Sequence, residues 1–313
     1  MNNSKKNVIF LMGPTASNKT KLAIKLSKFL PIDLISVDSG LVYKELEIGT
    51  AKPTKEELKF APHSLINIRS INEYYSAENF KQDALFEIKK SFSNKRIPVL
   101  VGGTMFYYNS LLNGLSPLPA RNDNLRKVLL KKFFHNSKNN LHKKLISIDP
   151  ISAFRIHPND SQRILRALEV YYLSKKKMSD LIKFKNYKFP YNSLKFIISP
   201  KNKNILHKKI EYRFEKMLSL GFQKEVENLI SKKFFNKNSP GMNCLGYKEM
   251  YDYIFGHINY KKMFFQTVLS TKKLAKNQMK WLINYKDAFW IDSEKLKFSI
   301  NFILNKIEKF FLK

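Results

Sequence analysis

The segment GPTASNKT, residues 13–20, constrains the fold of this chain more than any other feature. It nearly matches the phosphate-binding pattern G-x-x-x-x-G-K-[ST], with Asn18 where the pattern has its second glycine. Asn adopts positive φ more readily than most residues, so the turn stays accessible. An apolar run, NVIFLMG, precedes the loop, and we expect a helix from about Lys19 to Phe29. This strand–loop–helix order favours a phosphate cradle over an ordinary tight turn.

The N-terminal part of the chain alternates apolar strands with helices. Continuous apolar runs predict strands at 33–39, 63–68 and 96–104, and a helix is expected near 77–91. Strands separated by helices indicate a parallel sheet. We therefore predict the α/β class, with a P-loop-type parallel sheet flanked by helices and an all-helical insertion domain.

A change of pattern marks the insertion. The Pro-rich segment 114–123 is typical of a linker, 124–188 is helical and Lys-rich, and 193–200 is again typical of a strand. The later expected elements are helices at 204–220 and 261–284 and a short strand at 288–292. We predict two domains, an α/β catalytic core of residues 1–120 and 190–313, and a helical insertion of residues 121–189.

The net charge is the most unusual feature of the composition. With 57 Lys and Arg against 25 Asp and Glu, it is +32 over 313 residues. A polyanionic partner such as nucleic acid and a biased composition both account for this excess. The single cysteine, Cys244, excludes an internal disulfide and a cysteine zinc site. The N-terminal apolar run is too short for a signal peptide, and no stretch reaches a membrane span, so we expect a cytoplasmic protein.

The arginines are few and clustered. Only eight cations are Arg, and three of them lie within 155–166. On a helix, Gln162, Arg163 and Arg166 present an amide and two guanidinium groups, which suit phosphate or base contacts. Structural ion pairs and a solvated face are the alternatives. Tyr247, beside Lys248, likewise either stacks on a base or packs in a core.

Asp38 is the candidate general base. It ends the strand 33–39, at the sheet edge where α/β proteins bind ligands, and it faces the expected phosphate loop. A carboxylate there suits proton transfer from a hydroxyl or an amine, although a cap or an ion pair would also explain it. The strand 96–104 ends in Gly102 and Gly103, where many NTPases carry a metal-binding Asp. This difference argues against a standard ATPase.

Seven segments together resemble the bacterial tRNA dimethylallyltransferases, which prenylate adenosine 37 beside the anticodon. In chain order they are FLMGPTASNKT, LISVDSGLVYKELEIGTAKP, RIPVLVGGTMFYY, GLSPLP, DPISAFRIHPNDSQRILRALEV, RFEKMLSLGF and LGYKEM. The similarity extends from about Val8 to Asp292. Two residues depart from the family pattern, because Asn18 replaces the loop glycine and Glu45 stands where glycine is usual.

The resemblance implies an enzyme that transfers a dimethylallyl group from dimethylallyl diphosphate to N6 of adenosine 37. The product would be i6A37 in tRNAs that read codons starting with U, and the enzyme would be a monomer. Asp38 would be the base, Thr104 and Arg213 would lie at the reaction centre, and Thr20 would help to hold Mg²⁺. The diphosphate-binding residues would be Gly13, Pro14, Thr15, Ala16, Ser17, Asn18, Lys19 and Thr20.

The resemblance also implies a tRNA-binding set, with the helical insertion clamping the anticodon stem-loop. Its members would be Asp38, Ser39, Gly40, Leu41, Thr104, Arg126, Gln162, Arg163, Ile164, Leu165, Arg166, Asn243, Cys244, Leu245, Gly246, Tyr247 and Lys248. Two other functions stay open at this point. One is a P-loop small-molecule kinase with Asp38 as its base, and the other is a tRNA-binding protein whose catalysis is weakened or lost through Asn18. An adenylate prenyltransferase is disfavoured by the arginine-bearing insertion.

Overall fold

The computed structural model describes residues 6–133, 139–182 and 187–311. The chain forms two compact units, one of Met1–Leu111 with Pro190–Lys313 and the other of Leu112–Phe189. The first boundary lies at residue 112 and not at the predicted 121, because the linker packs within the second unit. Gly114 lies against Tyr187, and the Ser116 hydroxyl donates to the carbonyl of Ile182 at 3.5 Å.

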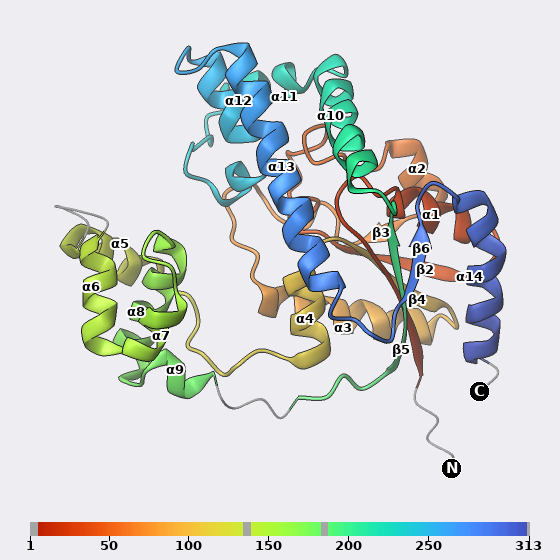
Figure 1. The fold of residues 1–313 in the computed structure, drawn as a ribbon, viewed down its shortest axis with the longest axis horizontal. Coiled ribbons are helices and arrows are strands. Elements are labelled where there is room, and N and C mark those ends of the chain that lie inside the picture. Colours follow the sequence, from red (N-terminus) through yellow and green to blue (C-terminus); the bar gives the residue numbers. More distant parts are fainter. Residues whose placement is uncertain (1–5, 134–138, 183–186, 312–313) are drawn as a thin grey trace. The chain divides into compact units, whose positions relative to one another are not determined.

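A single six-stranded sheet forms the centre of the first unit (Figure 1). Its order is β3-β2-β4-β1-β5-β6, and every pairing is parallel. The strands are β1 (Asn7–Met12), β2 (Ile32–Val37), β3 (His63–Ser64), β4 (Ile97–Gly102), β5 (Asn192–Ser199) and β6 (Phe289–Asp292). The predicted α/β class is confirmed. The prediction for β3 was too long, because Leu65 and Asn67 have φ values of 64° and 59°, which an extended strand does not contain.

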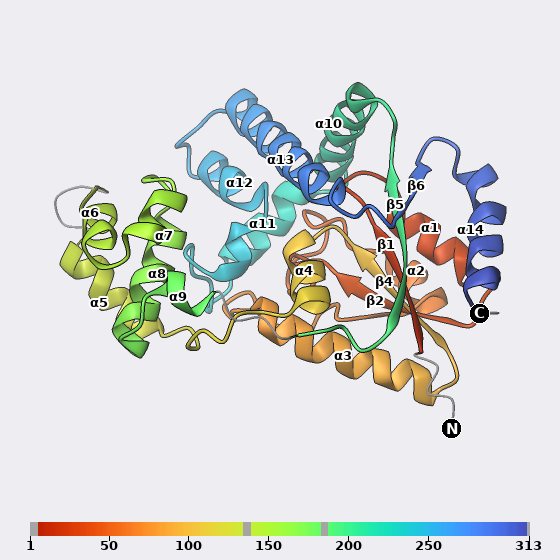
Figure 2. The ribbon, with the colours of Figure 1, turned by 60° about the horizontal axis from the view of Figure 1, so that its bottom comes forward.

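Helices cover both faces of the sheet (Figures 1 and 2). α1 and α14 pack on one face, where Leu22 and Ile303 join the apolar side chains of the strands. α4 covers the other face beside α3, and its Tyr108 ring lies 5.5 Å from the ring of Phe10 in β1. The flanking helices are α1 (Lys19–Leu26), α2 (Lys55–Phe60), α3 (Ala77–Ser93), α4 (Met105–Asn113) and α14 (Leu296–Phe311).

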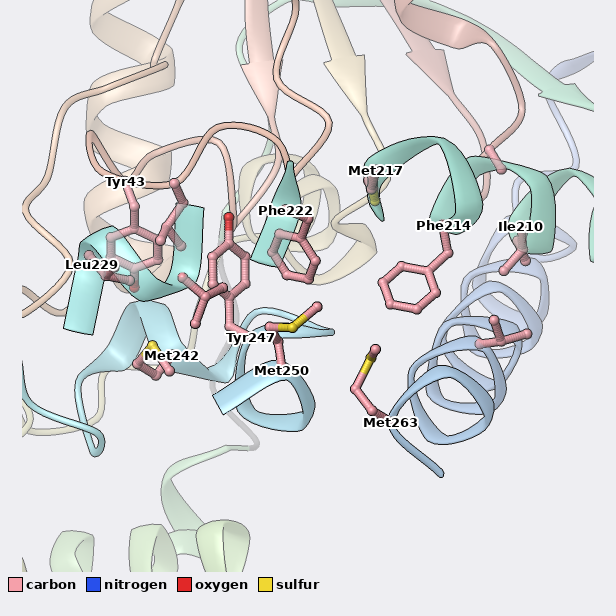
Figure 3. Close-up of a cluster of buried hydrophobic side chains, with 14 of the residues drawn as sticks. Tyr43, Ile210, Phe214, Met217, Phe222, Leu229, Met242, Tyr247, Met250 and Met263 are labelled. Carbon is pink, nitrogen blue, oxygen red and sulfur yellow. The ribbon is translucent and has the colours of Figure 1, made fainter. Parts of the chain in front are cut away.

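A second group of helices builds an apolar core of its own (Figure 3). The rings of Phe222 and Tyr247 meet edge to face at 5.0 Å, and both are fully buried. Val42, Tyr43 and Leu46 pack into the same cluster, so this core holds the loop that follows β2. The elements are α10 (Lys203–Ser219), α11 (Phe222–Ile230), η1 (Pro240–Asn243), α12 (Tyr247–Ile254) and α13 (Tyr260–Leu282).

The second unit is entirely helical in its described residues. Its elements are α5 (Asp123–Phe133), α6 (Asn139–Ile148), α7 (Pro150–Arg155), α8 (Ser161–Ser174) and α9 (Met178–Leu181). Leu141, Leu145, Ile164 and Leu168 form its buried centre. Across the described ranges of both units, no helix combines the length and the apolar character needed to cross a bilayer.

Candidate active site

A cavity of about 300 Å³ lies at the carboxyl ends of β1, β2 and β4. Parallel strands bring their carboxyl ends to one edge of a sheet, so the segments that follow these three strands meet there. They contribute Thr15, Lys19 and Thr20 after β1, Asp38 and Ser39 after β2, and Gly103 and Thr104 after β4. The helical part of the wall comes from α10, with Arg213, and from α13, with Leu274, Asn277, Gln278 and Trp281.

The loop at 13–20 has the backbone of a phosphate cradle. Asn18 has φ 62° and ψ 19°, in the left-handed region, and α1 begins at the next residue. This confirms that Asn fits the turn in place of glycine. The Asn18 side chain is exposed, whereas Gly13, Pro14, Ala16 and Ser17 are buried. Among the described residues, only Thr15, Lys19 and Thr20 of the loop line the cavity, so contact through the other five stays a prediction.

Lys19 and Arg213 bring positive charge to the cavity. The Lys19 ammonium donates to the carbonyl of Pro14 at 3.0 Å, and burial lowers its pKa to about 8. Nearby Asp38 opposes this shift of the pKa, whereas Arg213 adds to it. The Arg213 guanidinium donates to the Thr15 hydroxyl at 3.3 Å and to the Thr50 carbonyl at 3.4 Å. Both oxygens are neutral, so the two partly buried cations favour an anionic ligand.

The depressed pKa of Lys19 predicts a pH-dependent affinity for pyrophosphate. A bound anion favours the charged ammonium, so above about pH 8 binding must take up a proton and weakens by up to about tenfold per pH unit. Calorimetric titration with pyrophosphate from about pH 7 to 9.5 measures this loss. Lys19→Met is the control, because ionisation of the ligand affects both proteins equally. An affinity with the same pH dependence in both proteins would contradict the prediction.

Asp38 and Thr104 line the same cavity, where the ends of β2 and β4 are joined by hydrogen bonds. Asp38 accepts the backbone N–H of Gly40 at 2.8 Å and of Leu41 at 3.4 Å through Oδ1. The Thr104 hydroxyl oxygen accepts the N–H of Ser39 at 3.0 Å, and the Thr104 N–H donates to the Val37 carbonyl at 3.1 Å. The carboxylate and the hydroxyl are therefore held in defined positions facing the cationic loop.

The family model described as IPP transferase matches residues 41–285, well over half of the chain. The chain belongs to the IPP transferase family. This membership confirms the family to which the sequence segments pointed.

Individual relatives agree with this assignment. A tRNA dimethylallyltransferase of Buchnera aphidicola subsp. Acyrthosiphon pisum is 52% identical over 280 residues, which cover 90% of this chain and 88% of that protein. The crystal structure of a tRNA delta(2)-isopentenylpyrophosphate transferase from Staphylococcus epidermidis has a TM-score of 0.70 at 33% identity and covers 97% of this chain and 99% of its own. The structure of a eukaryotic dimethylallyltransferase acting on tRNA has a TM-score of 0.78 at 25% identity. The match covers 96% of this chain and 78% of the eukaryotic chain.

The residues that line the cavity fit a Mg²⁺ ion that binds together with a diphosphate. Among the described residues, no group of three or more His, Cys, Asp or Glu side chains could hold a metal ion. Thr20 lines the cavity and offers a hydroxyl, whereas the carboxylate of Asp38 is the candidate base. Mg²⁺ typically takes one or two carboxylates and completes its shell with water and substrate phosphates. The residues therefore fit a metal that arrives with its substrate.

The tRNA-binding set of this IPP transferase requires corrections in the helical insertion. Ile164 and Leu165 are 0% and 8% exposed and belong to the core of the second unit, so their side chains do not reach a ligand. Arg126 and Arg166 bind the fully buried carboxylate of Glu169, at 2.8 Å and 2.5 Å. The ion-pair interpretation therefore holds for these two arginines. Gln162 and Arg163 are exposed, and their contact with tRNA stays a prediction.

Glu169 is expected to stabilise the insertion. Burial alone raises the pKa of its carboxyl, but hydrogen bonds from Arg126, the Asn122 N–H and Arg166 lower it to about 2. Its stabilising effect is thus full above its ordinary pKa and is lost as the pH falls towards 2. Glu169→Ala leaves two partly buried arginines without their carboxylate partner, and we expect it to lower the free energy of unfolding by about 3 kcal/mol or more. Urea denaturation measures this loss, and Asp123→Asn, in an exposed pair with Arg121, is the control. Equal midpoints of urea denaturation for Glu169→Ala and Asp123→Asn would contradict this prediction.

The segment 243–248 also differs from its prediction. Tyr247 is fully buried, and its hydroxyl donates to Glu225 at 2.6 Å, so base stacking by this ring is wrong. Gly246 is buried as well, whereas Lys248 and Asn243 are exposed and joined at 2.7 Å. Burial raises the pKa of the Cys244 thiol to about 12, which makes it a poor nucleophile at neutral pH. Contacts of this segment with tRNA stay a prediction for its exposed members.

Two residues of the site were missed by sequence reasoning. Glu225 of α11 accepts the backbone N–H groups of residues 47, 48 and 49 at 3.2, 2.6 and 3.2 Å, and so holds the loop that presents Thr50 to Arg213. Gln278 of α13 lies in the cavity wall. Neither stands in a recognisable pattern, because each has partners more than 170 residues away in sequence. Glu45, a departure from the pattern that the resemblance implies, accepts the N–H of Ile71 at 2.9 Å.

Proposed function

We propose that this chain transfers a dimethylallyl group from dimethylallyl diphosphate to tRNA. The observation that carries the proposal is one cavity lined by two partly buried cations, Lys19 and Arg213, together with Asp38 and Thr104. The cations suit a diphosphate leaving group, and the carboxylate suits a nucleophile that must lose a proton. Membership of the IPP transferase family and a relative called tRNA dimethylallyltransferase support it.

In the proposed reaction, the amine N6 of adenosine 37 bonds to C1 of the dimethylallyl group. The C1–O bond breaks, and its electron pair leaves with the diphosphate, whose charge Lys19 and Arg213 stabilise. Because Oδ1 of Asp38 already accepts two backbone N–H groups, we assign the departing N6 proton to Oδ2. When bound, Mg²⁺ adds positive charge beside the diphosphate, with Thr20 helping to hold it.

The finer parts of the proposal concern the acceptor. We propose adenosine 37 of tRNAs that read codons starting with U, giving i6A37, because an unpaired loop base costs little to extrude into a cavity. Exposed residues of the implied set would bind the stem-loop, with the helical insertion as a clamp. Those residues are Ser39, Gln162, Arg163, Asn243 and Lys248. We further propose a cytoplasmic monomer.

Both alternative functions are weaker than prenyl transfer. A kinase of this type normally has an acidic metal ligand at a strand end, and β4 ends in glycines at that position. A tRNA-binding protein without catalysis would need Asn18 to disable the loop. The positive φ and the exposed side chain of Asn18 favour a working loop instead.

The test combines purified protein, labelled dimethylallyl diphosphate, Mg²⁺ and an anticodon stem-loop with adenosine at positions 36, 37 and 38. Label is expected on adenosine 37, and a stem-loop with guanosine at position 37 is the matched control. ATP turnover without labelled RNA would support the kinase. RNA binding without transfer would support the binding protein, and the absence of both binding and transfer would overturn every function based on tRNA.

Asn18→Gly is expected to change the transfer rate by less than about threefold and to stabilise the fold by about 0.5–1 kcal/mol. Glycine relieves the strain at φ 62°, whereas the exposed Asn18 side chain does not narrow the cavity. Steady-state transfer and thermal unfolding of the two proteins measure these effects. A gain in rate of more than about tenfold would show that Asn18 obstructs the diphosphate.

A further inference from the structure

Gln278 is the buried polar residue of α13 that faces the cavity. It lies between Leu274 and Trp281 on one face of the helix, and all three line the cavity. Gln278 is only 8% exposed, although glutamine is mostly found exposed, and it lies near the C-terminal end of the long helix α13. A buried amide is retained only where both its donor and its acceptor are satisfied, so its partners indicate its role.

Both ends of the Gln278 amide bind backbone groups of the active site. Oε1 accepts the N–H of Thr15 at 2.8 Å, and Nε2 donates to the carbonyl of Gly103 at 2.8 Å. A Cβ at Gly103 would lie 2.6 Å from this Nε2, so the glycine that ends the β4 segment makes room for the contact. A glutamine amide suits this bridge because it carries an acceptor and donors on one planar group.

The two bonds join the leaving-group side of the cavity to the acceptor side. Thr15 belongs to the phosphate loop, and its hydroxyl accepts from Arg213. Gly103 directly precedes Thr104, whose hydroxyl oxygen accepts the N–H of Ser39, next to Asp38. The Thr15 N–H is also occupied by Gln278, so it is not offered to the diphosphate. Strand pairing already joins β1 and β4 as far as Met12 and Gly102, and the amide extends this link into the loops that follow the two strands.

We propose that Gln278 is a positioning residue that sets the distance between the allylic carbon and the attacking amine. The inference rests on the proposed prenyl transfer. Substitution at carbon requires the nucleophile, C1 and the leaving oxygen in line, with the reacting atoms about 3–3.5 Å apart, and a displacement of about 1 Å costs about a hundredfold. Gln278 touches neither of the two reacting groups and acts through Thr15 and Gly103.

Mispositioning has a chemical signature besides a slower rate. If the amine is displaced, water can attack C1 in its place. The C1–O bond then breaks, diphosphate leaves with the electron pair, and the water oxygen loses a proton to give dimethylallyl alcohol. The ratio of alcohol to prenylated RNA therefore reports the geometry of the acceptor, and a loss of fold stability alone would not change that ratio.

Two variants test the proposal. Gln278→Glu keeps an acceptor for Thr15 but loses the donor to Gly103, and Gln278→Met keeps the length and loses both bonds. Gln266→Glu, on the same helix and outside the cavity wall, is the matched control. The measurements are kcat, KM for each substrate, pyrophosphate affinity, Tm, and the ratio of alcohol to prenylated RNA. Gln278→Glu is included because it remains informative if Gln278→Met fails to fold.

For both variants we expect kcat to fall about ten- to a hundredfold, with a raised alcohol ratio. The carboxylate of Gln278→Glu adds negative charge beside Lys19 and also weakens pyrophosphate binding, so an unchanged pyrophosphate affinity is expected for Gln278→Met alone. Gln266→Glu should match the unmodified protein. An unchanged kcat in Gln278→Glu would overturn the positioning role alone. A loss of kcat that is accompanied by a lower Tm and a lower pyrophosphate affinity, with an unchanged alcohol ratio, would also overturn it. No RNA prenylation by the unmodified protein would overturn the proposed function together with this inference.

Discussion

Asp38→Asn is expected to lower the single-turnover rate of prenyl transfer about a thousandfold, within the range of general-base contributions. The amide oxygen can still accept the N–H groups of Gly40 and Leu41, so the turn after β2 should persist. What the amide lacks is the basicity to accept the proton from N6. The rate is measured with RNA and dimethylallyl diphosphate both saturating, and RNA affinity is measured separately by fluorescence anisotropy.

Asp33→Asn is the matched control for the base. Asp33 lies on the same strand, β2, and its carboxylate pairs with the exposed Arg96 guanidinium at 2.5 Å. Neither residue lines the cavity. The loss of one surface ion pair should change stability by less than about 1 kcal/mol and leave transfer unaffected. A rate for Asp38→Asn within about tenfold of the unmodified protein would show that solvent, and not Asp38, takes the proton.

Arg213→Gln is expected to lower kcat by about a hundred- to a thousandfold, because the guanidinium stabilises charge that develops on the leaving diphosphate. The side chain comes from α10, and burial lowers the pKa of the guanidinium, although the residue stays charged at neutral pH. Its bonds to Thr15 and Thr50 hold it at the cavity before any substrate arrives. Preorganised charge of this kind acts more strongly in the transition state than in the ground state.

Arg213→Lys separates charge from geometry. Lysine retains the charge but lacks the planar fork that binds both oxygens, so we expect only partial recovery relative to Arg213→Gln. Arg96→Lys, at the exposed pair with Asp33, is the control. The measurements are kcat, KM for dimethylallyl diphosphate, and Tm. A raised KM at full kcat would contradict the prediction, since it would mean that Arg213 binds substrate and transition state equally.

The architecture of the first unit was largely predictable from local patterns. The strands are continuous apolar runs, and a parallel sheet covered on both faces requires such runs whatever the sequence around them. The backbone at Asn18 was predictable because few residues adopt positive φ in that turn. The length of β3 was not, because Leu65 and Asn67 adopt positive φ although neither belongs to a recognised turn pattern.

The site was predictable only in part. Asp38 and Lys19 were found because strand ends and phosphate loops are local patterns that meet at one sheet edge. The role of Arg126 was not, because its partner Glu169 lies 43 residues away, in another helix. The burial of Tyr247 could not be predicted either, because its ring packs against Phe222 of another helix, α11.

The sequence by itself determined the fold class, the family and the side chains that can hold a diphosphate and accept a proton. These features are readable from the sequence because hydrophobic periodicity, turn residues and short motifs depend on residues that are near one another in the chain. Only the tertiary structure decided which polar groups are neutralised and which remain available to substrates. Gln278 illustrates the reason, because it joins Thr15 and Gly103 across 263 and 175 residues of sequence. Such hydrogen bonds depend on distances that the packed helices and strands create.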